Sequence, residues 1–270
     1  MEQIDSNLLL RWFVAFSMDD KVWNHSVFSK NRDRLLEGEV SHRFFAQVLA
    51  QAEDADLLSK EHFSVDGTLI EALASHKSYR PKDEEGTPGG GGLNPTVDFR
   101  GEKLCRDTHE SKMDTEAYLY RKSKGKESKL AYIGHILMEN RQGLVVDSQV
   151  NQTTGTAERE LEVDIVDPLG GTQRVTLGAD RNYDTKDFVE DQREMRVTPH
   201  VAQSDSTRHS GYATSQTIRK RIEECFGWAK TIGGLRKSRF IGREKLDFQF
   251  VMTFAAYNLI RMRNLGLVSC

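Results

Sequence analysis

The sequence has few cysteines and no long apolar run, and these absences exclude several classes of protein. Its three cysteines, Cys105, Cys225 and Cys270, show no CxxC spacing, which argues against a zinc ribbon or a disulfide framework. The longest apolar run, residues 8–16, is too short to span a membrane and contains an arginine. The run is not typical of a signal peptide, because acidic residues precede it and no small-residue cleavage site follows it. We therefore expect a protein of the reducing cytoplasm.

Several catalytic motifs are missing as well. The eight histidines form no HExxH motif, and no GxSxG motif is present. The glycine-rich stretch at 87–92 is followed neither by Gly-Lys-Ser/Thr nor by a predicted helix, so we interpret it as a flexible linker rather than a phosphate-binding loop. Cys225 falls on the apolar stripe of a predicted helix and is interpreted as a packing residue rather than a nucleophile.

The net charge of -3 conceals a locally basic segment. Residues 208–245 contain only three acids, against ten basic residues: Arg208, Arg219, Lys220, Arg221, Lys230, Arg236, Lys237, Arg239, Arg243 and Lys245. A basic surface around an acidic site suits a phosphate backbone. The alternative interpretation is a solvated helix and loop, which is the usual meaning of a charge run.

The chain divides into a helical N-terminal segment, residues 1–58, and a mixed core, residues 59–270, with a flexible glycine-rich loop near 86–95. Helices are predicted at 4–16, 23–36 and 41–58, 156–167, 185–195, 215–230 and 246–262. Strands are predicted at 63–70, 130–138, 144–150, 174–179 and 197–201, with an irregular stretch at 75–127. The second and third strands form a hairpin. The first three helices are compatible with either a small DNA-binding bundle or a cap on the core.

Three acidic residues stand in contexts that suit one metal-binding site. Asp66 and Asp180 each follow an apolar stretch of strand composition, and Glu223 lies in a predicted basic helix. Carboxylates at the ends of neighbouring strands converge, because strands in a sheet lie about 5 Å apart. A third carboxylate from a packed helix completes a set of oxygen ligands suited to two magnesium ions and to the cutting and joining of DNA phosphodiesters.

Each acid also has an ordinary structural interpretation. Asp66-Gly67 is a typical hairpin turn, but the apolar residues that follow do not return as a simple hairpin. Asp180 suits a helix cap, although Asp184 lies closer to the predicted helix. Glutamate is common on exposed helix surfaces, so the functional interpretation of Glu223 depends on its neighbours.

The helix predicted at 215–230 has two distinct faces. Its apolar stripe consists of Ile218, Ile222, Cys225 and Ala229. An adjacent face carries Arg219, Glu223, Phe226 and Lys230, which are spaced by four, three and four residues. This face places one acid between two basic residues, as a metal ligand beside phosphate contacts would require. Glu224 points about 100° away and is the competing acid.

Aromatic side chains near this helix are candidates for stacking on bases. Trp228 is the strongest candidate, whereas core packing is expected for most of the others, Phe226 among them. The complete set of expected DNA contacts is Arg219, Lys220, Lys230, Arg236, Lys237, Arg239 and Trp228.

These residues resemble a known family. Arg219, Glu223 and Lys230 fit the second half of Y-x2-R-x3-E-x6-K, the signature of bacterial insertion-sequence transposases of the DDE class. Ser-Val-Asp-Gly-Thr around Asp66 and Leu-Gly-Ala-Asp-Arg-Asn-Tyr-Asp around Asp180 look like the two aspartate motifs of that family. The resemblance covers nearly the whole chain and includes residues 228–237 and 255–261.

The resemblance implies an α/β fold with an RNase H-like mixed sheet flanked by helices, preceded by a short all-helical segment. Asp66, Asp180 and Glu223 would bind two Mg2+ ions, for which Mn2+ can substitute, and Arg219 and Lys230 would hold phosphate. The implied activity is metal-dependent cleavage and strand transfer of an insertion sequence. The implied partners are the element's terminal inverted repeats, target DNA and a second protomer assembled on DNA, at the bacterial nucleoid.

The chain departs from the family pattern at several points. Gln216 replaces the signature tyrosine, and Asn182 stands where the family has glycine, although asparagine tolerates positive φ. The stretch between Val201 and Tyr212 is short for the family. Relatives usually begin earlier, so we expect a truncated copy that keeps the catalytic residues and lacks full recognition of the element ends.

Two alternative functions stay open from the sequence. The first is a DNA-binding remnant without turnover, which the intact acidic triad disfavours. The second is an RNase H-like nuclease that acts on RNA–DNA hybrids or junctions. Inverted repeats flanking the coding region would disfavour this second alternative.

Overall fold

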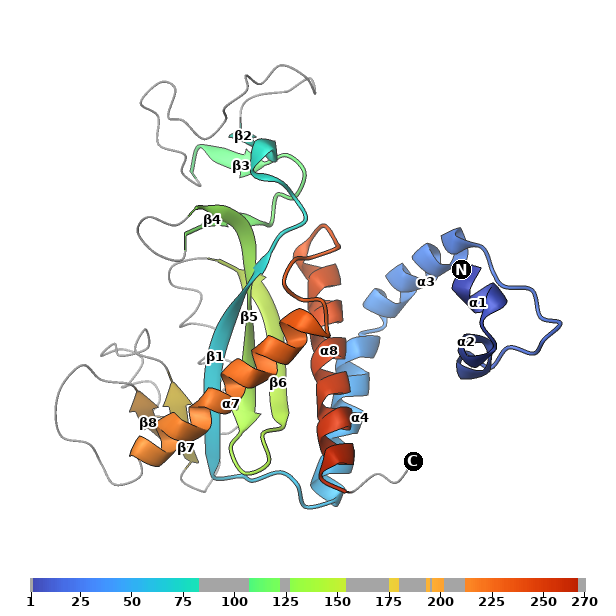
Figure 1. The fold of residues 1–270 in the computed structure, drawn as a ribbon. Helices are drawn as coiled ribbons and strands as arrows, with labels where there is room; N and C mark the ends of the chain where they lie inside the picture. The colour runs from blue at the N-terminus through green and yellow to red at the C-terminus, as the bar shows by residue number, and fades with distance from the viewer. Residues whose placement is uncertain are drawn as a thin grey trace.

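The computed structural model describes residues 2–82, 107–121, 127–153, 175–179, 193–194, 196–201 and 212–266, and Figure 1 shows their arrangement. The helices are α1 (Glu2–Ser6), α2 (Leu8–Phe13), α3 (His25–Glu37), α4 (Val40–Asp54), α7 (Tyr212–Thr231) and α8 (Arg243–Asn264). The strands are β1 (His62–Glu71), β2 (Tyr79–Pro81), β3 (His109–Ser111), β4 (Tyr118–Tyr120), β5 (Lys129–Glu139), β6 (Val145–Gln152), β7 (Val175–Ala179) and β8 (Val197–Val201). A single 3-10 turn, His76–Ser78, precedes β2.

The main sheet has the order β6-β5-β1-β7-β8, and the short strand β4 also pairs with β5. Strands β6, β5 and β1 are antiparallel, whereas β7 runs parallel to β1 and β8 runs parallel to β7. A three-stranded meander continued by two parallel strands is the arrangement expected of an RNase H-like core. The predicted fold class, a mixed sheet flanked by helices, is therefore confirmed.

All five predicted strands of this sheet are present, as is the predicted β5–β6 hairpin. Strands β2, β3 and β4 were not predicted, because each has only three residues and lies in the polar stretch 75–127, where no alternation marks a strand. The predicted helix at 156–167 and most of that at 185–195 lie outside the described residues.

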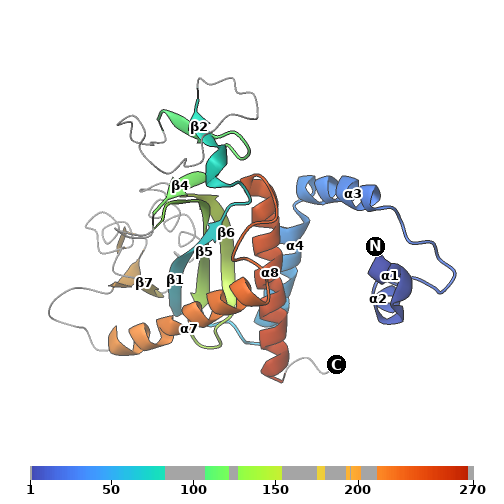
Figure 2. The ribbon, with the colours of Figure 1, turned by 45° about the horizontal axis from the view of Figure 1, so that its top comes forward.

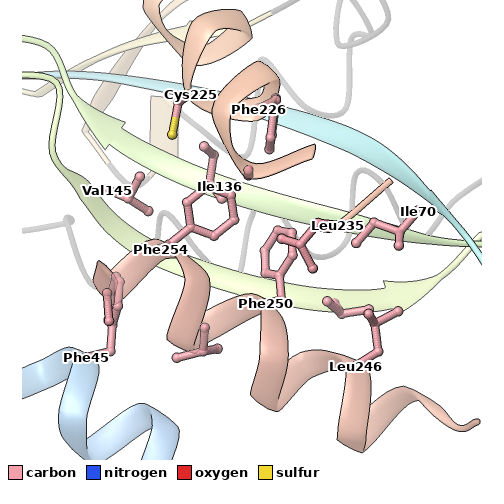
Figure 3. Close-up of a cluster of buried hydrophobic side chains, with 14 of the residues drawn as sticks. Phe45, Ile70, Ile136, Val145, Cys225, Phe226, Leu235, Leu246, Phe250 and Phe254 are labelled. Atoms are coloured by element: carbon pink, nitrogen blue, oxygen red, sulfur yellow. The ribbon is translucent and has the colours of Figure 1, made fainter. Parts of the chain in front are cut away.

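One face of the sheet packs against α7 and α8 through a large apolar core (Figure 3). Ile70 and Ile136 from the sheet meet Phe226 of α7 and Phe250 and Phe254 of α8. The two α8 rings are fully buried and lie edge to face with centroids 4.7 Å apart. Each such side chain contributes about 1.5–3 kcal/mol by leaving water, so burial of this core holds α7 and α8 on the sheet.

The N-terminal helices divide between the core and a separate group (Figures 1 and 2). Helix α4 lies along α8 and buries Phe45, Val48 and Ala52 in the main core, whereas α1, α2 and α3 extend away from the sheet. The single helix predicted at 4–16 was wrong. Asn7 ends α1 and caps α2 by accepting backbone hydrogen bonds from two residues of its first turn. The proposed division at residue 58 stays a prediction.

Within the described residues, no helix is both long and apolar enough to cross a lipid bilayer.

Two glycines offer opposite tests of this packing. A Cβ at Gly134 of β5 would overlap the ring of Phe250, whereas one at Gly227 of α7 would meet nothing within 4 Å. We expect Gly134→Ala to lower stability by about 1–3 kcal/mol through overpacking. The matched variant Gly227→Ala should raise it by about 0.5–1 kcal/mol, because alanine favours a helix interior. Urea denaturation measures both, and equal effects would contradict the packing of α8 on the sheet.

Candidate active site

Asp66 lies in the middle of β1, not at its end as predicted. The strand continues to Glu71, and Asp66 and Gly67 pair with Ile136 and His135 of β5 without forming a turn. Gly67 lacks a side chain where a Cβ would come within 3.1 Å of the His135 ring. Gly67 therefore leaves room for the His135 ring beside it. Asp66 lies neither at a strand end nor in a hairpin turn.

The alternation of β1 places Asp66 on the face that α7 covers. Side chains two residues apart share a face of a sheet, so Asp66 lies on the same side as Ile70. Ile70 and the cross-strand partner Ile136 belong to the core formed with α7 and α8. Asp66 is half-buried, and its Oδ1 accepts a hydrogen bond from the backbone N–H of Gly67 at 2.8 Å.

Helix α7 turns its apolar stripe to the sheet and leaves Glu223 exposed beside it. Ile222, Cys225 and Ala229 are buried, as predicted. Phe226 is buried with them, edge to face with Phe254 at 6.2 Å, which agrees with the core packing expected for it but removes it from the exposed face that carries Glu223. A period of about 100° per residue puts Glu223 next to the stripe and Glu224 on the solvent side.

Cys225 serves packing, as the sequence predicted. The thiol is fully buried, and burial raises the pKa of Cys225 to about 12. Because the thiolate is the nucleophilic form, this cysteine is inert at neutral pH.

Arg221 lies on the side of α7 opposite Glu223, because two positions along a helix correspond to a turn of about 200°. Its Nη1 donates to the carbonyl oxygens of Asn140 and Arg141, in the β5–β6 turn, at 2.9 and 3.3 Å. That turn lies at the beginning of β1, because the N–H of Asn140 donates to the carbonyl of His62. Glu223 therefore lies on the flank of α7 that faces away from the turn, in the direction in which β1 runs.

Some of the other predicted site residues lie within the described part of the chain and some do not. Asp180 and the side chain of Arg219 lie outside the described residues. Lys220 is exposed and Lys230 is half-buried on α7. Trp228 is half-buried and packs edge to face with Tyr257 of α8 at 5.5 Å, which places it away from Glu223.

The comparison with protein families decides the identity of the chain. The model of the Transposase DDE domain matches residues 58–259, well over half of the sequence. The chain is a DDE transposase. A second model, Transposase domain (DUF772), matches residues 1–34. The predicted resemblance to insertion-sequence transposases is confirmed, and the protein is an enzyme that acts on DNA.

Other comparisons add little to this assignment. No curated protein matches the transposase. One solved structure, a pre-cleavage Mos1 transpososome, is similar at a TM-score of 0.27 and 8% identity, over 97% of this chain and 75% of that one. A similarity at that level supports no argument about the residues of this protein.

Enzymes of this family generally use divalent metal ions. Among the described residues, no group of three His, Cys, Asp or Glu side chains forms a metal cluster. Asp66 and Glu223 supply carboxylate oxygens, which are the ligands that magnesium prefers. The donor chemistry of the described acids thus fits a hard divalent cation.

A basic segment follows α7 and attaches to the end of β1. The N–H of Glu71 donates to the carbonyl of Arg236, and the N–H of Ser238 donates to the carbonyl of Glu71. The Glu71 carboxylate also accepts from the Nζ atoms of Lys237 and Lys129 at 3.3 and 3.0 Å. These contacts fix the exposed residues Arg236 and Lys237 at the far end of the strand that carries Asp66.

The ion pairs of Glu71 should make this attachment depend on pH. Burial alone would raise the pKa of Glu71, but hydrogen bonds from Lys129 and Lys237 outweigh it and hold the pKa below its ordinary value. A lowered pKa stabilises the fold above the unfolded-state pKa, and the contribution disappears as the pH falls through the folded-state value. Glu71→Gln should thus be less stable than wild type by about 0.5–1 kcal/mol at pH 7. Chemical denaturation at pH 7 and at roughly pH 3 should show the difference shrink, and a constant difference would contradict the pairing.

Proposed function

We propose that Asp66, Asp180 and Glu223 form the active site with which this transposase cleaves and joins DNA strands. The observation that carries the proposal is that Asp66 lies on the sheet face covered by α7 and that Glu223 lies on α7 beside its buried stripe. Asp180 directly follows Ala179, the last residue of β7, and β7 pairs in parallel with β1. Two neighbouring strands and one covering helix would thus supply the three acids.

The proposed cofactor is a pair of Mg2+ ions, for which Mn2+ can substitute. Asp66, Asp180 and Glu223 would supply the carboxylate oxygens that hold the ions. When bound, two such ions activate an attacking oxygen and stabilise a leaving oxygen. Carboxylate ligands suffice, because magnesium keeps several water molecules in its coordination shell.

The proposed reaction has two phosphodiester steps. In the first, a water oxygen bonds to phosphorus at the element end and the 3′-oxygen leaves as a hydroxyl, taking up a proton. In the second, that 3′-hydroxyl attacks a target phosphate in line and displaces the target's own 3′-oxygen. Arg219 and Lys230 would hold the phosphates on either side of Glu223, and the substrates would be the terminal inverted repeats and target DNA.

The DNA would extend from the acidic site towards the basic segment at the end of β1. Glu71 lies five positions after Asp66, so the carboxylate and this segment lie about 17 Å apart along the strand. One strand of a duplex places a phosphate roughly every 3.4 Å along its axis, so this distance corresponds to about five base pairs. Lys220, Arg236, Lys237 and Arg239 are exposed and would neutralise phosphates over this span. A second protomer would join when the enzyme assembles on DNA.

The acidic site is tested by DNA cleavage with matched variants. Plasmid DNA carrying the element ends is incubated with the purified protein and Mg2+ or Mn2+. We expect Asp66→Asn, Asp180→Asn and Glu223→Gln each to reduce the cleavage rate at least about 100-fold while DNA binding persists, because a neutral amide replaces a charged carboxylate ligand and weakens the hold on the ions that stabilise the transition state. Glu224→Gln, which changes the neighbouring acid on the solvent side, should stay within about twofold. Equal effects at 223 and 224 would overturn the site.

The DNA path is tested by the salt dependence of binding. Affinity falls as salt rises, and each phosphate contact adds about 0.9 to the magnitude of the slope of log affinity against log salt concentration. The double variant Arg236→Ala/Arg239→Ala should therefore reduce the magnitude of this slope by roughly 1.5–2. Arg263→Ala removes an exposed charge at the end of α8, outside the proposed path, and should leave the slope unchanged. An unchanged slope in the double variant, or a loss of slope in Arg263→Ala as large as in the double variant, would contradict this path.

A further inference from the structure

The β5–β6 turn, residues 139–144, is organised by one buried carboxylate. Glu139 is fully buried and accepts hydrogen bonds from the backbone N–H groups of Arg141, Gln142 and Leu144. It also accepts one from the N–H of Ser59, in the connection between α4 and β1, at 3.2 Å. A carboxylate enclosed by backbone donors holds a turn in one shape, because any change would leave buried polar groups unpaired.

The same turn is attached to the strand that carries Asp66. The N–H of Asn140 donates to the carbonyl of His62 at 2.9 Å, and the hydroxyl of Ser64 donates to Oδ1 of Asn140 at 2.8 Å. Ser64 is fully buried and lies two residues before Asp66, on the same face of β1. The turn therefore has a fixed position relative to the first acid of the proposed site.

Two arginines from different helices bind the carbonyl oxygens of this turn. Arg221 of α7 binds those of Asn140 and Arg141 through one nitrogen, Nη1. Arg261 of α8 binds that of Gln142 through Nε at 2.6 Å. Arg221 lies two residues before Glu223, so the turn connects the strand of one proposed ligand to the helix of another.

We propose that Arg221 is a positioning residue that fixes the rotation of α7 and thereby the place of the Glu223 carboxylate relative to Asp66. The inference rests on the proposed function of these acids. The buried stripe of α7 is apolar and sets which side of the helix faces the sheet, but hydrophobic burial itself is not directional and leaves the finer rotation of the helix to polar contacts. Hydrogen bonds from Arg221 to two carbonyls are directional and supply that restraint.

The geometry of the helix makes such a restraint matter. A rotation of about 20° displaces a group 5–6 Å from a helix axis by roughly 2 Å. Magnesium requires its oxygen ligands at about 2.0–2.1 Å with near-octahedral geometry. A displacement of that size would remove the Glu223 carboxylate from the ion's coordination shell.

The test is direct Mn2+ binding by the full-length protein, followed by electron paramagnetic resonance of free Mn2+, in parallel with thermal denaturation. The Mn2+ dissociation constant of Glu223→Gln gives the reference value for a protein that lacks the third carboxylate. Arg221→Ala should raise the Mn2+ dissociation constant about tenfold, as is typical when a group that orients a ligand is removed. Arg221→Lys should stay within about threefold of wild type, because both hydrogen bonds come from a single nitrogen that an ammonium can replace.

Arg261→Ala is the matched control, because it removes a guanidinium from the same turn on a different helix. We expect its Mn2+ dissociation constant to stay within twofold of wild type. Equal Mn2+ binding by Arg221→Ala and wild type, with Glu223→Gln impaired, would overturn the positioning role alone. Equal loss in the two arginine variants would also overturn it and indicate a general loosening of the turn. Equal binding by Glu223→Gln and wild type would instead overturn the proposed site, and the positioning role with it.

Discussion

The burial of one stripe of α7 against the sheet and α8 is the interaction on which the candidate site depends. Ile222, Cys225 and Phe226 are withdrawn from water beside Phe254, and this leaves Glu223 at the margin of the contact. The same apolar layer contains Ile136, the cross-strand partner of Asp66. One hydrophobic contact thus brings the helix and the central strand together, and the two acids lie at its border.

Polar contacts add direction to this apolar contact. The Glu139 carboxylate accepts backbone hydrogen bonds within the β5–β6 turn. The carbonyl groups of that turn accept hydrogen bonds from Arg221 of α7 and Arg261 of α8. At the other end of β1, the carboxylate of Glu71 holds the basic segment that follows α7. The central strand is therefore attached at one end to the turn that binds Arg221 of α7, and at the other end to the segment that follows α7 in the sequence. An enzyme that must place several carboxylates within the reach of metal ions benefits from such restraint on both sides.

Much of this architecture was predictable from the sequence, and the failures have identifiable physical causes. The five strands of the main sheet and the helices around Glu223 and Phe250 carry clear apolar patterns over five residues or more. The three-residue strands β2–β4 carry none. Asp66 was placed at a strand end because it closes an apolar stretch, whereas β1 continues through it to Glu71, and Gly67 makes room for the ring of His135. The roles of Glu139 and Arg221 depend on contacts between residues about 80 positions apart, which local patterns do not contain. The only available signal was a charged residue at the last position of an apolar strand.

The central claim, that Asp66, Asp180 and Glu223 share one metal site, is tested most directly by metal-directed cleavage of the protein itself. Fe2+ bound in place of Mg2+ generates hydroxyl radicals with peroxide and ascorbate, and these cut the backbone close to the ion. The account predicts cuts near residues 66, 180 and 223 together, all suppressed by excess Mg2+ and by Asp66→Asn. Cuts confined to one of these segments, or cuts that persist in Asp66→Asn, would contradict it.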